Sequence, residues 1–163
     1  MRKHREIERK FLVKTLPTGW KRQPHSRITQ GYFFMGDKDI EIRLRKKDSE
    51  RFITIKAGHG YNRLEEEIPL PEQQFRTLWP LTRDARISKT RYKIPWSGRT
   101  IEKDIYAAPH RGLITADIEF NSRLQTRRFR PPPWFGREIT GDLRYSNQRL
   151  ARKRTKSKAH RRQ

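Results

Sequence analysis

The chain of 163 residues contains no cysteine, which excludes disulfides, thiolate metal sites and cysteine nucleophiles. Long apolar runs are also missing. No stretch approaches the roughly 18 apolar residues of a membrane-spanning helix, and the opening MRKHREIERK lacks the apolar core of a secretory signal. We therefore expect a soluble, cytoplasmic protein with no membrane partner.

Acidic residues are few compared with basic ones, 18 against 40, and the formal net charge is +22. Such a charge attracts polyanions, including nucleic acid, polyphosphate and nucleotides, but does not choose among them. The length suits one domain, which we place at residues 1–151. Residues 152–163, RKRTKSKAHRRQ, hold seven Lys or Arg and no acid. They predict a basic, disordered tail that either contacts polyanions nonspecifically or is only a solvated extension.

Short segments with alternating apolar and polar residues recur between turn residues, a pattern typical of antiparallel strands. They predict eight strands, at residues 6–13, 27–34, 39–47, 51–57, 62–70, 87–93, 99–106 and 113–121. Hairpin turns are expected at Gly36-Asp37, Asp48-Ser49, residues 58–60 and Ser97-Gly98.

Helices are expected to be few and short. Residues 71–81, PEQQFRTLWPL, begin with proline and space Phe75, Leu78 and Leu81 as one helix face would. A second irregular or helical section after Asn121 is broken by the prolines of 131–133. Residues 134–151 are expected to add a further short helix with aromatic anchors.

Seven of the eight predicted strands, all except 27–34, carry one face of charged residues. In EIERKFLV, Glu6, Glu8 and Lys10 share a side, because successive side chains of a strand point to opposite faces. The pattern fits either an ordinary wet sheet face or a charged interior. Interior charges must be paired or bind ions. Carboxylates hold hard cations, and Lys and Arg hold phosphate oxygens, which are the two parts that phosphoryl transfer requires.

The ordered motifs resemble those of the CYTH superfamily, the triphosphate tunnel metalloenzymes, over residues 4–151. EIERKFLV is similar to the family's ExExK signature, and it is followed in order by ITQGYF, EIRLRKK, ITIKAG, EEEIPL, ISKTRY, ADIEF and PPPWFGREITGD. The small bacterial members that hydrolyse inorganic tripolyphosphate resemble the chain most. The resemblance implies an α+β fold: an eight-stranded antiparallel β-barrel that forms an open tunnel, with short helices packed outside.

The resemblance also implies roles for particular residues. Mg²⁺ or Mn²⁺, at two sites, would be bound by Glu6, Glu8, Glu65, Glu67, Asp117 and Glu119. Substrate phosphate would be bound by Lys10, Arg43, Arg45, Lys56, Lys89, Arg91 and Tyr32. Lys56, Glu8 and Lys89 are the expected catalytic residues, and Glu102 and Asp104 form an additional acidic pair. Ser146 and Gln148 stand where some relatives have lysine.

Three functions stay open at this point. The first is metal-dependent hydrolysis of inorganic triphosphate to pyrophosphate and phosphate. The second is action of the same fold on another triphosphate, as an adenylate cyclase, thiamine triphosphatase or nucleoside triphosphatase. The third is a polyanion-binding module with little turnover. The sequence does not choose the triphosphate, the metal, or between a monomer and a homodimer.

Overall fold

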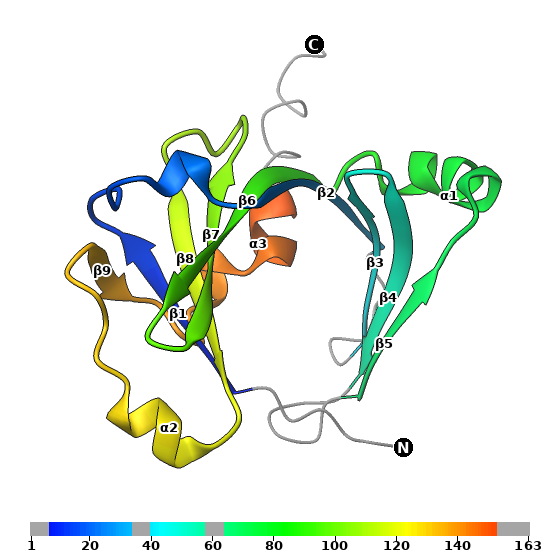
Figure 1. Ribbon diagram of the computed structural model, residues 1–163. Helices are drawn as coiled ribbons and strands as arrows, with labels where there is room; N and C mark the ends of the chain where they lie inside the picture. The colour runs from blue at the N-terminus through cyan, green and yellow to red at the C-terminus, as the bar shows by residue number, and fades with distance from the viewer. Residues whose placement is uncertain (1–6, 34–39, 58–63, 153–163) are drawn as a thin grey trace, which may run out of the picture. The chain divides into compact units, whose positions relative to one another are not determined.

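The computed structural model describes residues 7–33, 40–57 and 64–152 (Figure 1). The described chain divides into two compact units. The first unit holds residues 27–33, 40–57, 64–88 and 143–152, and the second unit holds residues 7–26 and 89–142.

The first unit contains a sheet with the strand order β5-β4-β3-β2. Its strands are β2 (His25–Phe33, the part from Arg27 on), β3 (Ile40–Lys47), β4 (Glu50–Ala57) and β5 (Leu64–Pro69). Neighbouring strands are antiparallel, and the turn predicted at Asp48-Ser49 joins β3 to β4, with Asp48 at φ 51°. The other predicted turns of this unit, at 36–37 and 58–60, lie outside the described residues.

The structure confirms the helix predicted at residues 71–81 and shows that it consists of two parts. The two parts are α1 (Glu72–Leu78), which lies near β4, and the 3₁₀ turn η3 (Trp79–Thr82). Phe75 is buried and stacks on Trp79 with ring centroids 5.1 Å apart, so Trp79 is a packing anchor. The close contact of η3 with β2 depends on Gly31, because a Cβ atom there would lie 2.2 Å from Oγ1 of Thr82.

Two short elements near the end of the described chain complete the first unit: η4 (Leu143–Tyr145) and α3 (Asn147–Arg152). Ser146 caps α3, since its Oγ accepts a hydrogen bond from the backbone N–H of Arg149 at 3.2 Å. A hydroxyl at this position therefore has a local structural role that a lysine would not fill. None of the described helices has the length and apolarity needed to cross a membrane.

The second unit contains a sheet with the strand order β6-β7-β8-β1-β9. Its elements are β1 (Ile7–Val13), η1 (Trp20–Arg22), β6 (Arg86–Trp96, the part from Lys89 on), β7 (Arg99–Tyr106), β8 (Ile114–Phe120), α2 (Arg123–Arg128) and β9 (Phe135–Glu138). The predicted Ser97-Gly98 hairpin is confirmed: both residues have positive φ, 46° and 71°, as a two-residue turn between twisted strands requires.

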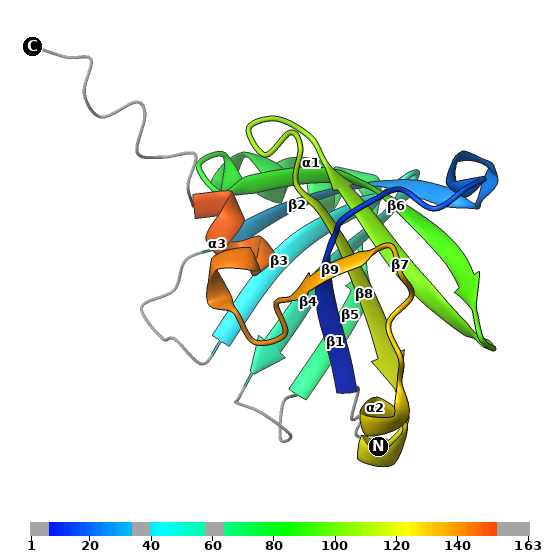
Figure 2. The same cartoon turned by 90° about the vertical axis from the view of Figure 1, so that its left-hand side faces the viewer.

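The predicted count of eight strands is one short of the nine strands in the described residues. The additional strand, β9, lies beside β1 (Figure 2). It pairs with β1 through Phe11 opposite Glu138 and Val13 opposite Phe135, with a shift in register between them. Residues 134–151 were expected to add only a helix. Four residues are too few for a visible alternation, and β9 is defined by its pairing with a distant strand.

An aromatic cluster forms the core of the second unit. Phe11 lies 4.6 Å from Phe135 between ring centroids, and Trp134 meets Phe135 edge-on at 4.5 Å. All three side chains are buried, which confirms Trp134 and Phe135 as packing anchors and places Phe11 of β1 in this core. Arg9 lies over the Phe11 ring and donates two hydrogen bonds to the Glu138 carboxylate, which holds β9 beside β1.

Lys103 is a buried cation on β7 with aromatic neighbours. Its side chain is fully shielded from solvent, and its Nζ lies 3.2 Å from the centroid of Trp20 and 4.7 Å from that of Tyr92. Among the described residues no hydrogen-bond acceptor reaches this Nζ. Burial lowers the pKa of Lys103 to about 8. The faces of the two rings attract the ammonium.

Replacing Lys103 by methionine, which has a similar length and no charge, is expected to raise the free energy of unfolding by about 1–3 kcal/mol at pH 7. The folded wild type binds fewer protons than the unfolded chain between pH 8 and 10.5, so its stability rises with pH across that window. The advantage of the variant should therefore shrink at pH 10. Urea unfolding at both pH values measures this, and a less stable variant at pH 7 would show that the ring contacts outweigh the burial.

Candidate functional site

Charged side chains gather on one face of each sheet. In the second unit, cross-strand register places Glu8 opposite Glu119 and Lys10 opposite Asp117, and it places Asp117 opposite Glu102. Together with the basic residues of β6 they form what we call the second-unit cluster: Glu8, Lys10, Lys89, Arg91, Glu102, Asp104, Asp117 and Glu119. Glu6, also predicted for this site, lies outside the described residues.

Asp104 lies at the buried base of the second-unit cluster. Its carboxylate is 2.5 Å from Nζ of Lys89 and accepts two hydrogen bonds from Arg91, both at 2.7 Å. Burial by itself would raise the pKa of Asp104, but the Lys89 charge and the Arg91 hydrogen bonds outweigh it and hold that pKa well below its usual range. Asp104 therefore acts as the anchor of two basic side chains. Glu102 forms an ion pair with Arg91 and is more exposed.

Lys89 differs from an ordinary surface lysine in its burial and in its pKa. Burial lowers the pKa of its ammonium to about 8, although the Asp104 charge acts in the opposite direction. The side chain is almost completely buried, so its position is set by Asp104 and by the packing around it. The Tyr106 ring lies 5.5 Å from its Nζ.

Carboxylates and one lysine form the more open part of the second-unit cluster. Nζ of Lys10 lies 2.9 Å and 3.0 Å from the two carboxylate oxygens of Asp117. Desolvation by the surrounding protein, together with the negative charge of Asp117, raises the pKa of Glu8 to about 7, even though part of this side chain reaches solvent. Glu102, Asp117 and Glu119 line a small cavity of about 130 Å³.

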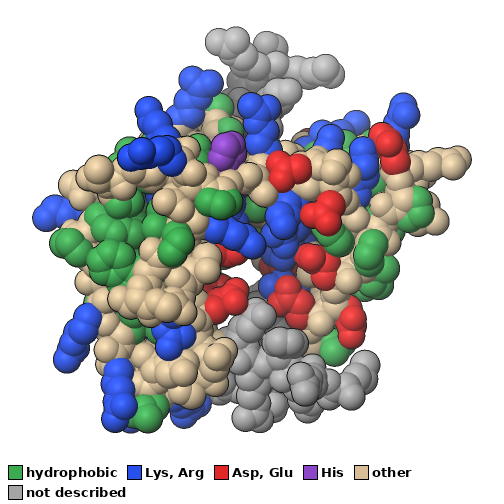
Figure 3. Space-filling model, viewed as in Figure 1, with side chains coloured by type: hydrophobic (Ala, Val, Ile, Leu, Met, Phe, Trp, Pro, Cys, Tyr) green, Lys and Arg blue, Asp and Glu red, His purple; other side chains and the backbone are tan. Residues whose placement is uncertain are grey.

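The first-unit cluster lies on one face of β3, β4 and β5 and comprises Arg43, Arg45, Lys56, Glu65 and Glu67. Nζ of Lys56 is 2.7 Å from Glu65, and Nη1 of Arg45 is 3.1 Å from Glu67. Arg43 lies farther away, at 3.9 Å from Glu65. The space-filling view shows acidic and basic side chains side by side over these strands (Figure 3). Tyr32 lies opposite Arg43 in the sheet and is buried.

Two further residues that were not among the predicted site residues join the first-unit cluster. Thr54 is fully buried on β4, and its Oγ1 donates a hydrogen bond to Glu67 at 3.3 Å. Glu41 on β3 lies 3.7 Å from Nη1 of Arg43. Glu41 shares strand parity with Arg43 and Arg45, which is a signal that the sequence contained. Thr54 carries no charge and offered no such signal.

The donor types of both clusters suit a divalent cation and phosphate, but they do not form a finished metal cage. Within the described residues, no three acidic or histidine side chains converge closely enough to hold a cation without other ligands. Most of the carboxylates are instead ion-paired to lysine or arginine. These ion pairs can be replaced when ligands bind. Phosphate oxygens can bind the lysine and arginine side chains, and cations can bind the carboxylates.

The chain is similar to known proteins in sequence and in structure. No known family model matches the chain. The chain is 44% identical over 149 residues to an inorganic triphosphatase of Nitrosomonas europaea. The aligned region covers 90% of this chain and 96% of that protein. It is 35% identical over 155 residues to an inorganic triphosphatase of Acetivibrio thermocellus, with 91% and 94% covered.

Solved structures agree with the sequence relatives. A crystal structure of an inorganic triphosphatase matches with a TM-score of 0.72 at 40% identity, covering 90% of this chain and 94% of that one. A protein of Pyrococcus horikoshii matches in fold, with a TM-score of 0.52 at 16% identity over 93% and 99% of the two chains. The predicted α+β, strand-rich antiparallel fold is thereby confirmed.

The chain belongs to the CYTH superfamily, the triphosphate tunnel metalloenzymes. Within that superfamily its sequence relatives include bacterial proteins named inorganic triphosphatase.

Proposed function

We propose that the protein is an enzyme that hydrolyses inorganic triphosphate to pyrophosphate and phosphate. The observation that carries this proposal is 44% identity to an inorganic triphosphatase along 90% of the chain. The two clusters support it, because they combine many basic groups with carboxylates, as a highly charged substrate and its cations require. The division into a domain at 1–151 and a basic tail at 152–163, and the cytoplasmic location, stay predictions.

A divalent cation, Mg²⁺ or Mn²⁺, fits the chemistry of the donors. In the second unit Glu8, Asp117 and Glu119 would hold one cation, and Glu6 is assigned there from the sequence. The raised pKa of Glu8 supports this assignment, since a carboxylate whose charge is disfavoured by its surroundings gains from a nearby cation. Glu65 and Glu67 of the first unit are the donors that we assign to a second cation. Bound cations would polarise the phosphoryl oxygens and lower the pKa of bound water.

The basic residues bind and orient the substrate. Lys10, Lys89 and Arg91 of the second unit, and Arg43, Arg45 and Lys56 of the first, would neutralise phosphoryl oxygens and the charge that develops on the leaving pyrophosphate. In the first unit, Lys56 and Arg45 would exchange their carboxylate partners for phosphate. The freed Glu65 and Glu67 would then be available to a cation. Tyr32, being buried, is assigned a supporting place beside Arg43.

Phosphate release from tripolyphosphate, ATP and thiamine triphosphate, each with Mg²⁺, Mn²⁺ or excess chelator, tests the proposal. We expect tripolyphosphate to be hydrolysed fastest and the chelator to abolish turnover. Faster release from ATP or thiamine triphosphate would assign the chain to another triphosphate. Inactivity on all three would favour a polyanion-binding module.

Metal binding can be tested without turnover. We expect calorimetric titration with Mn²⁺ to show weaker binding, by about tenfold or more, in the Glu8→Gln variant. Glu66→Gln is the matched control, because Glu66 on β5 is exposed and lies on the opposite strand face from Glu65 and Glu67. Equal Mn²⁺ affinity in wild type and Glu8→Gln would remove Glu8 from the proposed ligands.

A further inference from the structure

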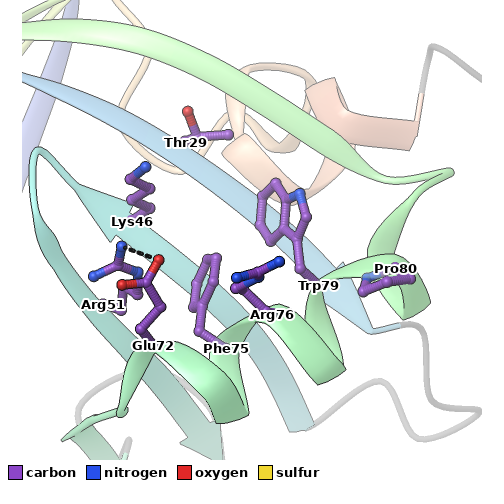
Figure 4. A pocket seen from close by; sticks show the side chains of 8 residues that line it. All are labelled: Thr29, Lys46, Arg51, Glu72, Phe75, Arg76, Trp79 and Pro80. Atoms are coloured by element: carbon purple, nitrogen blue, oxygen red, sulfur yellow. Dashed lines mark ion pairs between the residues drawn. The ribbon is translucent and has the colours of Figure 1, made fainter.

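A second cavity lies in the first unit, between the helical segment α1–η3 and the strands β2, β3 and β4 (Figure 4). Its volume is about 470 Å³. Small-molecule sites typically span about 300–1,000 Å³, so this cavity is large enough for a ligand of nucleotide size. Its lining residues are Thr29, Lys46, Arg51, Glu72, Phe75, Arg76, Trp79 and Pro80.

The cavity is separate from the first-unit cluster. Lys46 pairs in register with Thr29 on one side and Arg51 on the other, and all three line the cavity. Arg45, the neighbour of Lys46 in the chain, belongs to the first-unit cluster. Because consecutive side chains of a strand point to opposite faces, the cavity and the cluster lie on opposite faces of the same sheet.

The charged groups of the cavity leave two cations available. Arg51 is paired with Glu72 at 3.1 Å. Within the part of the chain that the structure describes, neither Lys46 nor Arg76 has an ion pair or a side-chain hydrogen bond, and Arg76 is exposed. Three basic residues and one acidic residue give the lining a net charge of +2. An anion would therefore find two unneutralised donors there.

The remaining wall is apolar and aromatic. Phe75 and Trp79 stack nearly parallel, with an interplanar angle of 19°. The guanidinium of Arg86, the first residue of β6, lies 4.2 Å from the Trp79 centroid. Figure 4 shows Lys46 and Arg51 from the sheet, and Phe75, Arg76 and Trp79 from the helical segment, around the same space. A ligand that uses the whole cavity must thus have an apolar, flat part as well as an anionic part.

We propose that this cavity binds a nucleoside phosphate. Lys46 and Arg76 would hold the phosphate, since lysine and arginine are the usual partners of phosphate oxygens. The base would lie against the aromatic wall, where Arg76 can also stack on it. Inorganic triphosphate has no part that would use this wall. The site is therefore distinct in ligand and in place from the proposed triphosphatase site, and the two proposals can fail independently.

Calorimetric titration of the full chain with AMP, ribose 5-phosphate and orthophosphate tests the proposal, in the absence of metal. We expect AMP to bind about tenfold or more tightly than ribose 5-phosphate, because only AMP presents a base. Lys46→Glu and Arg76→Glu should each weaken AMP binding about tenfold or more. Arg83→Glu, at an exposed position just after η3, is the matched charge control and should bind AMP like the wild type.

Competition and folding checks complete the test. Saturating tripolyphosphate should leave AMP binding at the cavity in place, and circular dichroism should show unchanged folds for the exposed Arg76→Glu variant and its control. The proposal is overturned by absent AMP binding, by equal affinity for AMP and ribose 5-phosphate, by displacement of AMP by tripolyphosphate, or by folded Lys46→Glu and Arg76→Glu variants that bind AMP normally.

Discussion

Replacing Asp104 by asparagine is expected to lower kcat/KM for tripolyphosphate by about 100-fold or more and to destabilise the fold by about 3–5 kcal/mol. The reason is geometric and electrostatic. Asp104 is fully buried and holds both Lys89 and Arg91, so the asparagine variant leaves the nearly buried Lys89 ammonium without the Asp104 charge. It also removes at least one of the two hydrogen bonds that Arg91 donates to this carboxylate, because asparagine keeps only one acceptor oxygen. Steady-state kinetics and urea unfolding measure the two effects.

Asp104 is a positioning residue, because it acts on the substrate only through Lys89 and Arg91. Its test therefore needs a measurement that separates lost activity from lost stability. Lys89→Met and the double variant Asp104→Asn/Lys89→Met complete a cycle. Replacing both residues should restore part of the stability, because the Lys89 ammonium no longer lies buried without the Asp104 charge, but it should not restore activity. Asp84→Asn, which removes an exposed ion pair, is the control. Folded Asp104→Asn enzyme with activity within about twofold of wild type would contradict the assignment.

Replacing Lys56 by alanine is expected to lower kcat/KM by about 100-fold or more, with little change in stability. Lys56 is a partly exposed cation whose partner, Glu65, lies at 2.7 Å and is itself well exposed, so the pair contributes little to the fold. In the proposed reaction Lys56 neutralises charge on the substrate phosphate. Phosphate-release kinetics and thermal unfolding of the same preparations separate the two contributions.

Glu65→Gln distinguishes the two roles open to the partner of Lys56. If Glu65 only pairs with Lys56, the glutamine variant should keep most of its activity. If Glu65 binds a cation, as we propose, activity should fall strongly and recover in part at higher Mg²⁺ concentration. Glu66→Gln is the control for Glu65→Gln, because it removes a carboxylate from the same strand.

Arg83→Ala is the control for Lys56→Ala, because it removes a positive charge elsewhere on the first unit. Wild-type turnover by Lys56→Ala would contradict the role assigned to Lys56.

Much of the local structure could be predicted from the sequence because its causes are local. Alternation of apolar and charged residues indicated β1, β3, β4, β5, β6, β7 and β8, and turn chemistry indicated the hairpins at Asp48-Ser49 and Ser97-Gly98. The proline start and apolar spacing of residues 71–81 indicated the helical segment. β9 was missed because Gly136 and its neighbours carry no alternating pattern, and only the pairing with β1 makes them a strand.

The chemistry of the candidate site divides in the same way. Strand parity alone placed Glu8 with Lys10, Arg43 with Arg45, and Glu65 with Glu67, because the direction of a side chain in a strand depends only on its position in that strand. It could not show that Asp104 lies beneath Lys89 and Arg91, while Glu102, two residues away, stays more exposed. Both acids have the same parity, and they differ only in what covers them.

The sequence by itself therefore determined eight of the nine described strands, the charged faces of seven of them and, through its ordered motifs, the superfamily. Only the tertiary structure decided which acid pairs with which base, and which carboxylate holds basic side chains in place while another stays more exposed. It also decided that Lys46 and Arg76 line the same cavity as Phe75 and Trp79. The physical reason is that side-chain alternation is a property of neighbouring residues. Ion pairing, burial and the shifts in pKa that follow depend on the register of strands far apart in the chain.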